Sequence, residues 1–255
     1  MNVSKTELTS LLKQAFESLS FYTGEHDNAA ATVVWAEMCG MQGLQALRRS
    51  LIRLEQQRPL PLTLISEDDG HAVFDAKDGC CLNWADVVTN LAYVKALKHG
   101  TSSVTVLNCH ERKLVIKAMV DCGRRGMGCS LHWYDSDDPS IVHGVTFDVA
   151  AGATGLPSYT VGRGSEDNNS ADDQGKSLFI HCSTGSQSLK HLQPALSDLH
   201  QSESTVLEAD AMNNIYYSAV DHGLDIEEDL WQFLQKIAQG VLVCSSEQSR
   251  RGAGT

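Results

Sequence analysis

Three absences narrow what this sequence of 255 residues can be. It contains no apolar run near the roughly 20 residues that cross a bilayer, and its opening MNVSKTEL lacks the basic-then-apolar order of a signal peptide. Lysines and arginines number 20 against 32 aspartates and glutamates, so the cationic surplus that nucleic-acid binding requires is missing. We therefore expect a cytoplasmic protein with no nucleic acid and no membrane as partner.

Paired short spacings of metal ligands are also missing. Eight cysteines occur, but none forms C-x-x-C, and Cys80 and Cys81 are adjacent. The histidines at positions 132, 143, 181 and 191 are scattered singly, and no two of them share the i, i+4 spacing of a helical metal pair. We expect no metal site, and reduced, mostly buried thiols that pack as small apolar side chains.

What is present begins with helical periodicity. Ser4 followed by Glu7 has the form of a capping box, and apolar residues then recur at helical spacing to about residue 24. Asp27 can cap a second helix that runs to about Met38. Leucines at positions 44, 47, 51 and 54 predict a third helix, which two prolines end. Residues 1–60 are therefore predicted to be a helical segment.

From residue 61 the pattern changes to alternating strands and helices. A strand HAVFDA precedes a helix over about 83–98, with one predicted buried face: Trp84, Val87, Val88, Leu91, Val94 and Leu97. The strand SVTVL, a helix over about 111–122 and the strand MGCSLHW follow. This order predicts an α/β fold, in which N-terminal helices precede strand–helix–strand units on a mixed sheet.

The remaining chain divides into two further segments after an α/β core at 61–150. Residues 151–176 are rich in Gly, Ser, Asn and Asp without an apolar period, which predicts a loop or subdomain boundary. Residues 177–255 predict a C-terminal α/β segment: a strand SLFIHCS, helices near 189–199 and 209–221, and a last helix that Asp225 and Glu228 can cap. An Arg/Gly tail, SEQSRRGAGT, ends the chain.

The most informative short stretch is VTVLNCHERK, where a strand ends in polar residues before a helix begins. Alternation along a strand sends Asn108 and His110 to one side and Cys109 towards the core. His110 could act as an acid or base, and Asn108 and Arg112 could contact a ligand held at the helix start. In the alternative interpretation Asn108 and Glu111 cap the helix, and His110 is an ordinary polar residue with satisfied hydrogen bonds.

The C-terminal tail supplies a second set of candidates. Ser249, Arg250 and Arg251 lie in a glycine-rich terminus, which is usually frayed. If the tail folds back, the two guanidinium groups could bind a carboxylate or phosphate.

Six stretches of the sequence follow one another in an order that a known family shares: KTELTSLLKQAF, WAEMCGMQGLQALRR, FDAKDG, WADVVTNLAYVKALKHG, VTVLNCH and LVIKAMVDCGRRGMGCS. In this order residues 3–135 resemble the N-terminal half of the malate/L-lactate dehydrogenases that do not use a Rossmann domain. The whole chain, including LWQFLQKIAQGVLVCSSEQSRRGAG, is similar to a bacterial family known as domain of unknown function 3726. The first resemblance implies a homodimer, a small carboxylate ligand and NAD(P) as a candidate cofactor.

The sequence departs from the dehydrogenase pattern at its reactive positions. That family carries a Ser-His pair after the glycine of its second helix, whereas Gly43 is followed here by Leu44, Gln45, Ala46 and Leu47. The strand-end histidine is matched by His110, but Glu111 and Arg112 follow it where the family has glycine, and no Gly-Thr-Asn-Pro stretch occurs. The cofactor is therefore left undetermined.

Two hypotheses follow. In the first, the protein is an enzyme related to reductases and dehydrogenases of small 2-oxo, 2-hydroxy or cyclic imino acids, with His110 as acid/base or cofactor contact. In the second, it is a non-catalytic relative that keeps the scaffold and binds a ligand or partner. The fold alone does not decide between them.

Overall fold

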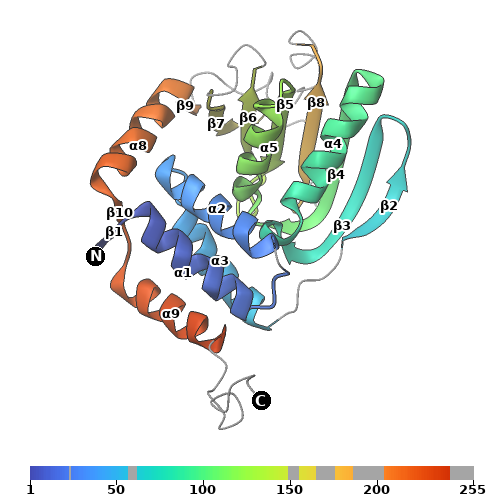
Figure 1. Cartoon of the computed structure of the whole chain (residues 1–255). Coiled ribbons are helices and arrows are strands. Elements are labelled where there is room, and N and C mark those ends of the chain that lie inside the picture. The colour runs from blue at the N-terminus through green and yellow to red at the C-terminus, as the bar shows by residue number, and fades with distance from the viewer. Residues whose placement is uncertain (23, 57–61, 149–154, 165–175, 186–203, 242–255) are drawn as a thin grey trace, which may run out of the picture.

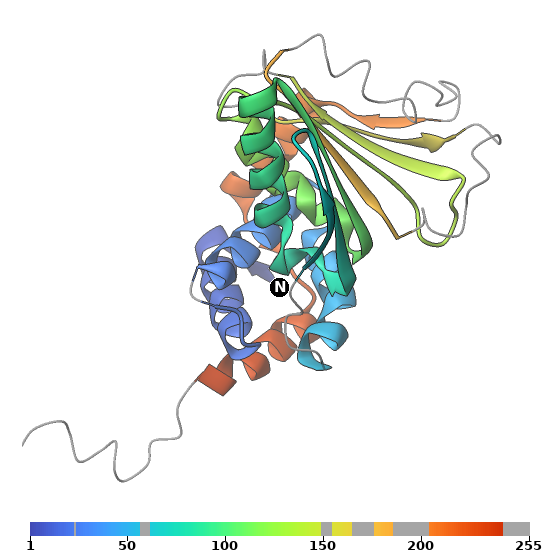
Figure 2. The same ribbon diagram turned by 90° about the vertical axis from the view of Figure 1, so that its right-hand side faces the viewer.

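The computed structural model describes residues 1–22, 24–56, 62–148, 155–164, 176–185 and 204–241. Its strands form one large mixed sheet; two helices lie on one face of that sheet, and a group of helices packs at its end (Figure 1). Figure 2 shows the same arrangement turned by 90°, with α4 and α5 on one side of the strands. The fold is α/β, as the sequence predicted.

Eight strands form the sheet in the order β2-β3-β4-β8-β5-β6-β7-β9. Their bounds are Thr63–Glu67, His71–Cys80, Thr101–His110, Leu178–Ser183, Gly128–Tyr134, Ile141–Phe147, Ser158–Arg163 and Thr205–Leu207, in sheet order. β3 and β4 run parallel, whereas the other neighbouring pairs are antiparallel. A separate pair joins β1 (Asn2–Val3) to β10 (Leu224–Asp225).

Five of the described strands were not predicted: β1, β2, β7, β9 and β10. β2 lies at the sheet's edge and all of its residues are exposed, so its sequence carries no alternation of buried and exposed side chains. β7 lies inside the segment 151–176 that we expected to be a loop, so the loop prediction is wrong for Ser158–Arg163. In that strand the Tyr159 side chain and the Gly162 backbone are buried, and hydrogen bonding with β6 sets its position in the sheet, which local composition does not predict. The proposed domain boundaries stay a prediction.

The N-terminal helices follow the sequence closely. α1 (Lys5–Ser18) begins at the predicted capping box of Ser4 and Glu7. α2 (Glu25–Met38) begins after Gly24, whose φ of 92° suits glycine, so the predicted cap at Asp27 is wrong. Asp27 lies in the first turn instead and pairs with Lys13 at 2.8 Å.

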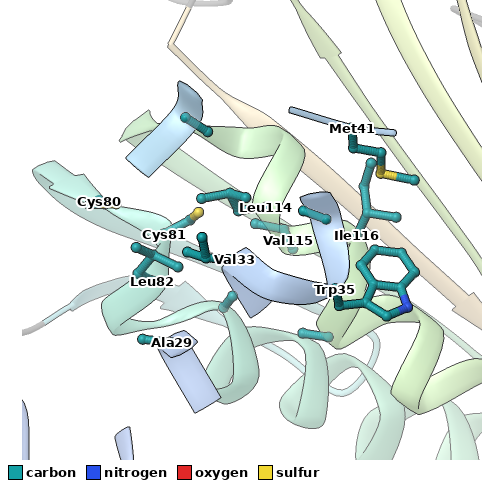
Figure 3. Close-up of a cluster of buried hydrophobic side chains, with 14 of the residues drawn as sticks. Ala29, Val33, Trp35, Met41, Cys80, Cys81, Leu82, Leu114, Val115 and Ile116 are labelled. Carbon is teal, nitrogen blue, oxygen red and sulfur yellow. The ribbon is translucent and has the colours of Figure 1, made fainter. Parts of the chain in front are cut away.

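α3 (Gly43–Gln56) buries its leucine stripe in the core that joins the helices to the sheet. The four leucines at positions 44, 47, 51 and 54 are at most 7% exposed. Figure 3 shows part of this core, where Val33 of α2 lies near Cys81, Leu82, Leu114 and Val115 from the segments that follow β3 and β4. The strand ends therefore rest on a packed apolar base.

α4 (Ala85–His99) buries only part of the face that was predicted: Trp84 and Val88 are buried as expected. Val88, Ala92 and Ala96 are buried, whereas Val87, Val94 and Leu97 are more than half exposed. Small side chains let the helix approach β4 closely, and Ser102 of that strand donates a hydrogen bond to the Ala92 carbonyl at 2.6 Å. The predicted end at Gly100 is confirmed by its φ of 87°.

α5 and α9 begin later in the sequence than predicted, whereas α8 begins where it was predicted. Arg112–Leu114 form a 3-10 turn, η2, before α5 (Val115–Gly123). α8 (Ala209–His222) ends at Gly223 as expected. α9 (Glu228–Ala238) has Glu227 at its N-cap, so neither Asp225 nor Glu228 occupies the predicted cap position. None of the described helices is long and apolar enough to span a membrane.

The thiols behave as the sequence predicted within the described part of the chain. Seven cysteines are described there, and all are buried and free. Burial raises the pKa of Cys39 to about 12 and that of Cys122 to about 11. Cys39 and Cys122 therefore stay protonated and pack as apolar groups.

Candidate functional site

The carboxyl ends of three strands meet at one edge of the sheet. β3 and β4 are parallel, and β4 and β5 share a direction because both run antiparallel to β8 between them. The polar residues that follow these strands therefore gather at that edge, close to the start of η2 and α5. Open α/β folds place ligands at such an edge.

The backbone is strained where β3 and β4 end. Lys77, Asp78, Asn108 and Glu111 have φ values of 50°, 60°, 50° and 55°, in the left-handed region that side chains disfavour by about 1–2 kcal/mol per residue. Asp75 holds two of them, because its Oδ1 accepts hydrogen bonds from the Lys77 amide at 2.8 Å and from Asn108 Nδ2 at 3.0 Å. Such strain is concentrated at functional sites, where the surrounding structure must maintain it.

His110 lies in this strained region with charged neighbours. Its Nε2 is 3.3 Å from Asp78 Oδ1, and Lys176 Nζ donates to the same oxygen at 3.3 Å. Burial and the Arg53 guanidinium lower the pKa of His110, and the contact with Asp78 opposes them. The imidazole is therefore neutral at neutral pH and able to accept a proton. We call Asp75, Asp78, Asn108 and His110 the β3–β4 cluster.

The capping interpretation of this stretch is wrong. No side chain caps η2 or α5. Asn108 donates to Asp75 instead, and Glu111 receives two hydrogen bonds from Arg49 of α3, at 2.9 and 2.8 Å. Asn108 and Glu111 therefore link the end of β4 to β3 and α3, and neither side chain caps the helix that follows.

Cys109 and Arg112, which are close to His110 in the sequence, both point away from its side chain. Cys109 is turned to the core as expected, and burial raises its pKa to about 12, which excludes a reactive thiolate. We expected Arg112 beside Asn108 and His110, but it is buried. Its guanidinium donates to Ser136 Oγ at 2.6 Å and to the Ser177 carbonyl at 3.3 Å. The chain reverses at Glu111, so Arg112 points towards β5 and β8.

The tail candidates Ser249, Arg250 and Arg251 lie outside the described residues. Their role as ligand contacts stays a prediction.

The start of α3 packs closely against α2. A Cβ atom added to Gly43 would lie 2.2 Å from the Val33 carbonyl oxygen and 2.8 Å from the Glu37 amide, so only glycine fits. Glu37 Oε2 accepts a hydrogen bond from the Leu44 amide at 2.9 Å, and Leu47 is completely buried. No side chain at positions 43, 44 or 47 offers a titratable group here.

A second polar cluster lies where β5, β6 and β7 adjoin. His143 Nδ1 is 2.8 Å from the Tyr159 hydroxyl, and its Nε2 is 3.2 Å from Asp135 Oδ2. The imidazole stacks on Trp133 with 5.1 Å between ring centroids, and Lys113 Nζ lies 5.6 Å from the centre of the Tyr159 ring. We call Lys113, Asp135, His143 and Tyr159 the β5–β7 cluster.

Sequence reasoning missed this cluster because it treated each histidine separately. The pairing of β5 with β6 sets His143 opposite Trp133, and β7 sets Tyr159 one step along the same face. A hairpin prediction through the turn that contains Pro139 could have found the first contact. His132 and His181 form a separate stack with centroids 5.6 Å apart, and burial lowers their pKa values to about 3 and about 4.

Neither a metal nor a dinucleotide is favoured by the described residues. No group of three His, Cys, Asp or Glu side chains among them could hold a metal ion. A pyrophosphate requires free amides and positive charge at a helix start. At the start of η2 the Glu111 carboxylate is present, only 14% exposed and already paired with Arg49. The residues at this turn do not fit a dinucleotide phosphate, so we derive no chemical step through a nicotinamide.

Residues 3–77 match the family model described as protein of unknown function (DUF3726). A search of the curated proteins found no match. Among solved structures, malate dehydrogenase from Pyrococcus horikoshii is 12% identical with a TM-score of 0.64, covering 95% of this chain and 96% of that chain. The fold is that of the malate/lactate dehydrogenases.

Two further solved structures share this fold. A putative malate/lactate dehydrogenase from E. coli is 10% identical with a TM-score of 0.65 and covers 98% of both chains. Δ1-Piperideine-2-carboxylate reductase from Pseudomonas syringae is 10% identical with a TM-score of 0.60, covering 93% of this chain and 99% of that chain. The predicted resemblance to this fold and to domain of unknown function 3726 is thus confirmed.

Proposed function

We propose that this protein binds a small 2-oxo, 2-hydroxy or cyclic imino acid at the carboxyl edge of its sheet, with His110 as the acid/base contact. The observation that carries the proposal is the β3–β4 cluster. Four left-handed non-glycine residues surround a neutral imidazole that already contacts a carboxylate. Such strain is concentrated at functional sites, and these residues lie at the edge where α/β folds bind ligands.

The charges around His110 suit a small carboxylate. Arg53, Lys77 and Lys176 supply three cations, and Asp75 and Asp78 supply two carboxylates that are already hydrogen-bonded. This local excess of positive charge contrasts with the net charge of −12 for the whole chain. A carboxylate ligand would be attracted to it, and such attraction weakens as salt is added.

The second candidate is a non-catalytic relative that binds the acid without converting it. Buried Leu47 and the glycine-only position at Gly43 favour this candidate, because the resembled dehydrogenases carry their Ser-His pair in this region. The neutral imidazole of His110 is compatible with the enzyme hypothesis, since it could exchange a proton with a bound substrate.

The experiment combines binding with turnover. NADH and NADPH binding would be followed by fluorescence, binding of pyruvate and oxalate by calorimetry, and reduction of 2-oxo acids by loss of NADH absorbance. If the protein is an enzyme, His110→Ala abolishes turnover and leaves the melting temperature nearly unchanged, whereas exposed His222→Ala changes neither. Acid binding without nicotinamide binding or turnover would select the non-catalytic relative, and absence of acid binding would refute the proposal.

We also propose that the protein is a homodimer. The exposed side of α4 is a candidate dimer interface. Val87, Val94 and Leu97 form an apolar stripe there, on a helix whose opposite face covers the sheet. The leucine stripe of α3 is not available, since it lies in the core. A cytoplasmic location is likewise our proposal, to be tested by cell fractionation.

A further inference from the structure

The β5–β7 cluster is a connected chain of titratable groups that the proposed role of His110 does not use. Its members come from four separate segments: Lys113 from η2, Asp135 after β5, His143 from β6 and Tyr159 from β7. They lie at the end of the sheet face that is otherwise filled by apolar side chains such as Leu131. A polar chain at this position loses solvation, which a packed apolar residue would avoid.

Hydrogen bonding fixes the proton positions in this chain. Burial raises the pKa of Asp135, but hydrogen bonds from the Asp137 and Asp138 amides and from His143 outweigh it and lower the pKa overall. The Asp135 carboxylate is therefore ionised and can only accept, so His143 Nε2 carries a proton. In neutral His143 the Nδ1 atom then accepts the hydrogen bond from the Tyr159 hydroxyl.

Protonation of His143 would reverse the second of these hydrogen bonds. With protons on both nitrogens, Nδ1 donates to the Tyr159 oxygen, and the phenol proton becomes available to another acceptor. Burial lowers the pKa of His143, Asp135 acts to raise it, and Lys113 and Arg112 act to lower it. The unliganded imidazole is thus neutral at neutral pH, and a nearby anion with an acceptor oxygen would favour its protonation.

Lys113 supplies the charge that such an anion requires. Burial and then Arg49 lower its pKa, whereas the nearby carboxylates of Glu111 and Asp135 act to raise it. Among the residues that the structure describes, its ammonium makes no direct ion pair or hydrogen bond. It lies against the face of the Tyr159 ring. A partly buried ammonium that no carboxylate contacts directly is costly to maintain, and a bound carboxylate would supply that contact.

We propose that the β5–β7 cluster holds the small acid, with the Lys113 ammonium on its carboxylate and the Tyr159 hydroxyl donating to its 2-oxygen. Binding is then coupled to proton uptake by His143, which Asp135 orients. His143 and Asp135 are positioning residues in this arrangement. The inference rests on the proposed function for the class of ligand, and it places the acid at the β5–β7 cluster instead of beside His110, because β8 and β5 lie between β4 and β6.

The test uses oxalate as the probe and acetate as a control that has a carboxylate but no second oxygen. Calorimetry at pH 7.5, in two buffers with different ionisation enthalpies, measures both affinity and proton uptake. We expect oxalate to bind the wild-type protein with uptake of close to one proton, and acetate to bind more weakly without uptake. Failure of oxalate to bind at millimolar concentration would overturn both this inference and the proposed function.

Variants separate the roles. Lys113→Met should weaken oxalate binding about tenfold or more, because a charged hydrogen bond is lost. The control Lys117→Met, at a lysine that pairs with Asp121, should change binding less than twofold. Tyr159→Phe and His143→Asn should abolish the proton uptake, a measurement that a purely structural role would not change. Near-ultraviolet circular dichroism checks that each variant is folded.

The outcomes distinguish this inference from the proposed function. If His110→Ala abolishes binding but Lys113→Met and Tyr159→Phe bind oxalate as the wild type does, the role of His110 stands and the inference is overturned. If Lys113→Met weakens binding and Tyr159→Phe abolishes proton uptake, while His110→Ala changes neither, the inference stands and the role of His110 is refuted. Unchanged proton uptake in Tyr159→Phe would overturn the coupling.

Discussion

Replacing Asp75 by alanine tests whether the strained strand ends are held by one carboxylate. The change removes the hydrogen bonds from the Lys77 amide and the Asn108 amide group, at 2.8 and 3.0 Å. A hydrogen bond to a charged group contributes about 1.5–3 kcal/mol when buried, and we take less than half of that for each because Asp75 is close to solvent. Lys77 and Asn108 would keep their left-handed strain without this support.

The expected loss is about 2 kcal/mol of unfolding free energy, which lowers the melting temperature of a chain of this size by about 4–8 °C. Urea and thermal unfolding followed by circular dichroism would measure it. Asp69→Ala is the matched control, because that side chain is 89% exposed, and it should change stability by less than about 0.5 kcal/mol. An equally small change in Asp75→Ala would refute the supporting role.

The effect should also depend on pH. Hydrogen bonds from Asn108 and from the Lys77 amide lower the pKa of Asp75 in the folded protein below its unfolded value of about 3.9. A carboxyl group with a lowered pKa contributes stability above its unfolded pKa and loses it as the pH falls through the folded pKa. The difference between wild type and Asp75→Ala should therefore be constant near pH 7 and shrink below about pH 4.

Three further outcomes are expected. Leu47→His should destabilise the protein by about 3–5 kcal/mol and create no proton donor, because the site is completely buried; urea unfolding and a turnover assay would check it, and a stable, active variant would contradict it. Gly43→Ser should prevent folding or cost more than about 3 kcal/mol, since its Cβ would lie 2.2 Å from the Val33 carbonyl oxygen; normal soluble expression with an unchanged melting temperature would count against the contact. Light scattering should report twice the 27.7 kDa of one chain, and the double change Val87→Glu with Val94→Glu should return it to a monomer; a wild-type monomer at micromolar concentration would reject the dimer.

Local sequence signals predicted those parts of the fold that depend on neighbours along the chain. The capping box at Ser4 and the helix end at Gly100 follow from hydrogen bonds and backbone angles that a few adjacent residues decide. The buried leucines of α3 follow from a spacing that only one helix face satisfies. The orientation of Cys109 towards the core follows from strand alternation.

Tertiary contacts decided the rest. α4 exposes valines and leucine and buries alanines, because close approach to β4 favours small side chains over large apolar ones. β7 forms within a glycine- and serine-rich segment because β6 and β9 provide its hydrogen-bond partners, which no local pattern records. The prediction that Asn108 caps a helix was wrong for the same reason, because its side chain donates a hydrogen bond to Asp75 of a neighbouring strand.

The candidate site divides in the same way. The sequence by itself determined that Asn108 and His110 end a strand on one side and that positions 44–47 carry no Ser-His pair, because side-chain chemistry and strand alternation are properties of the chain. Only the tertiary structure brought Lys113, His143 and Tyr159 together. Their contacts depend on the register of antiparallel strands, and a shift of one residue in that register would send each side chain to the opposite face of the sheet.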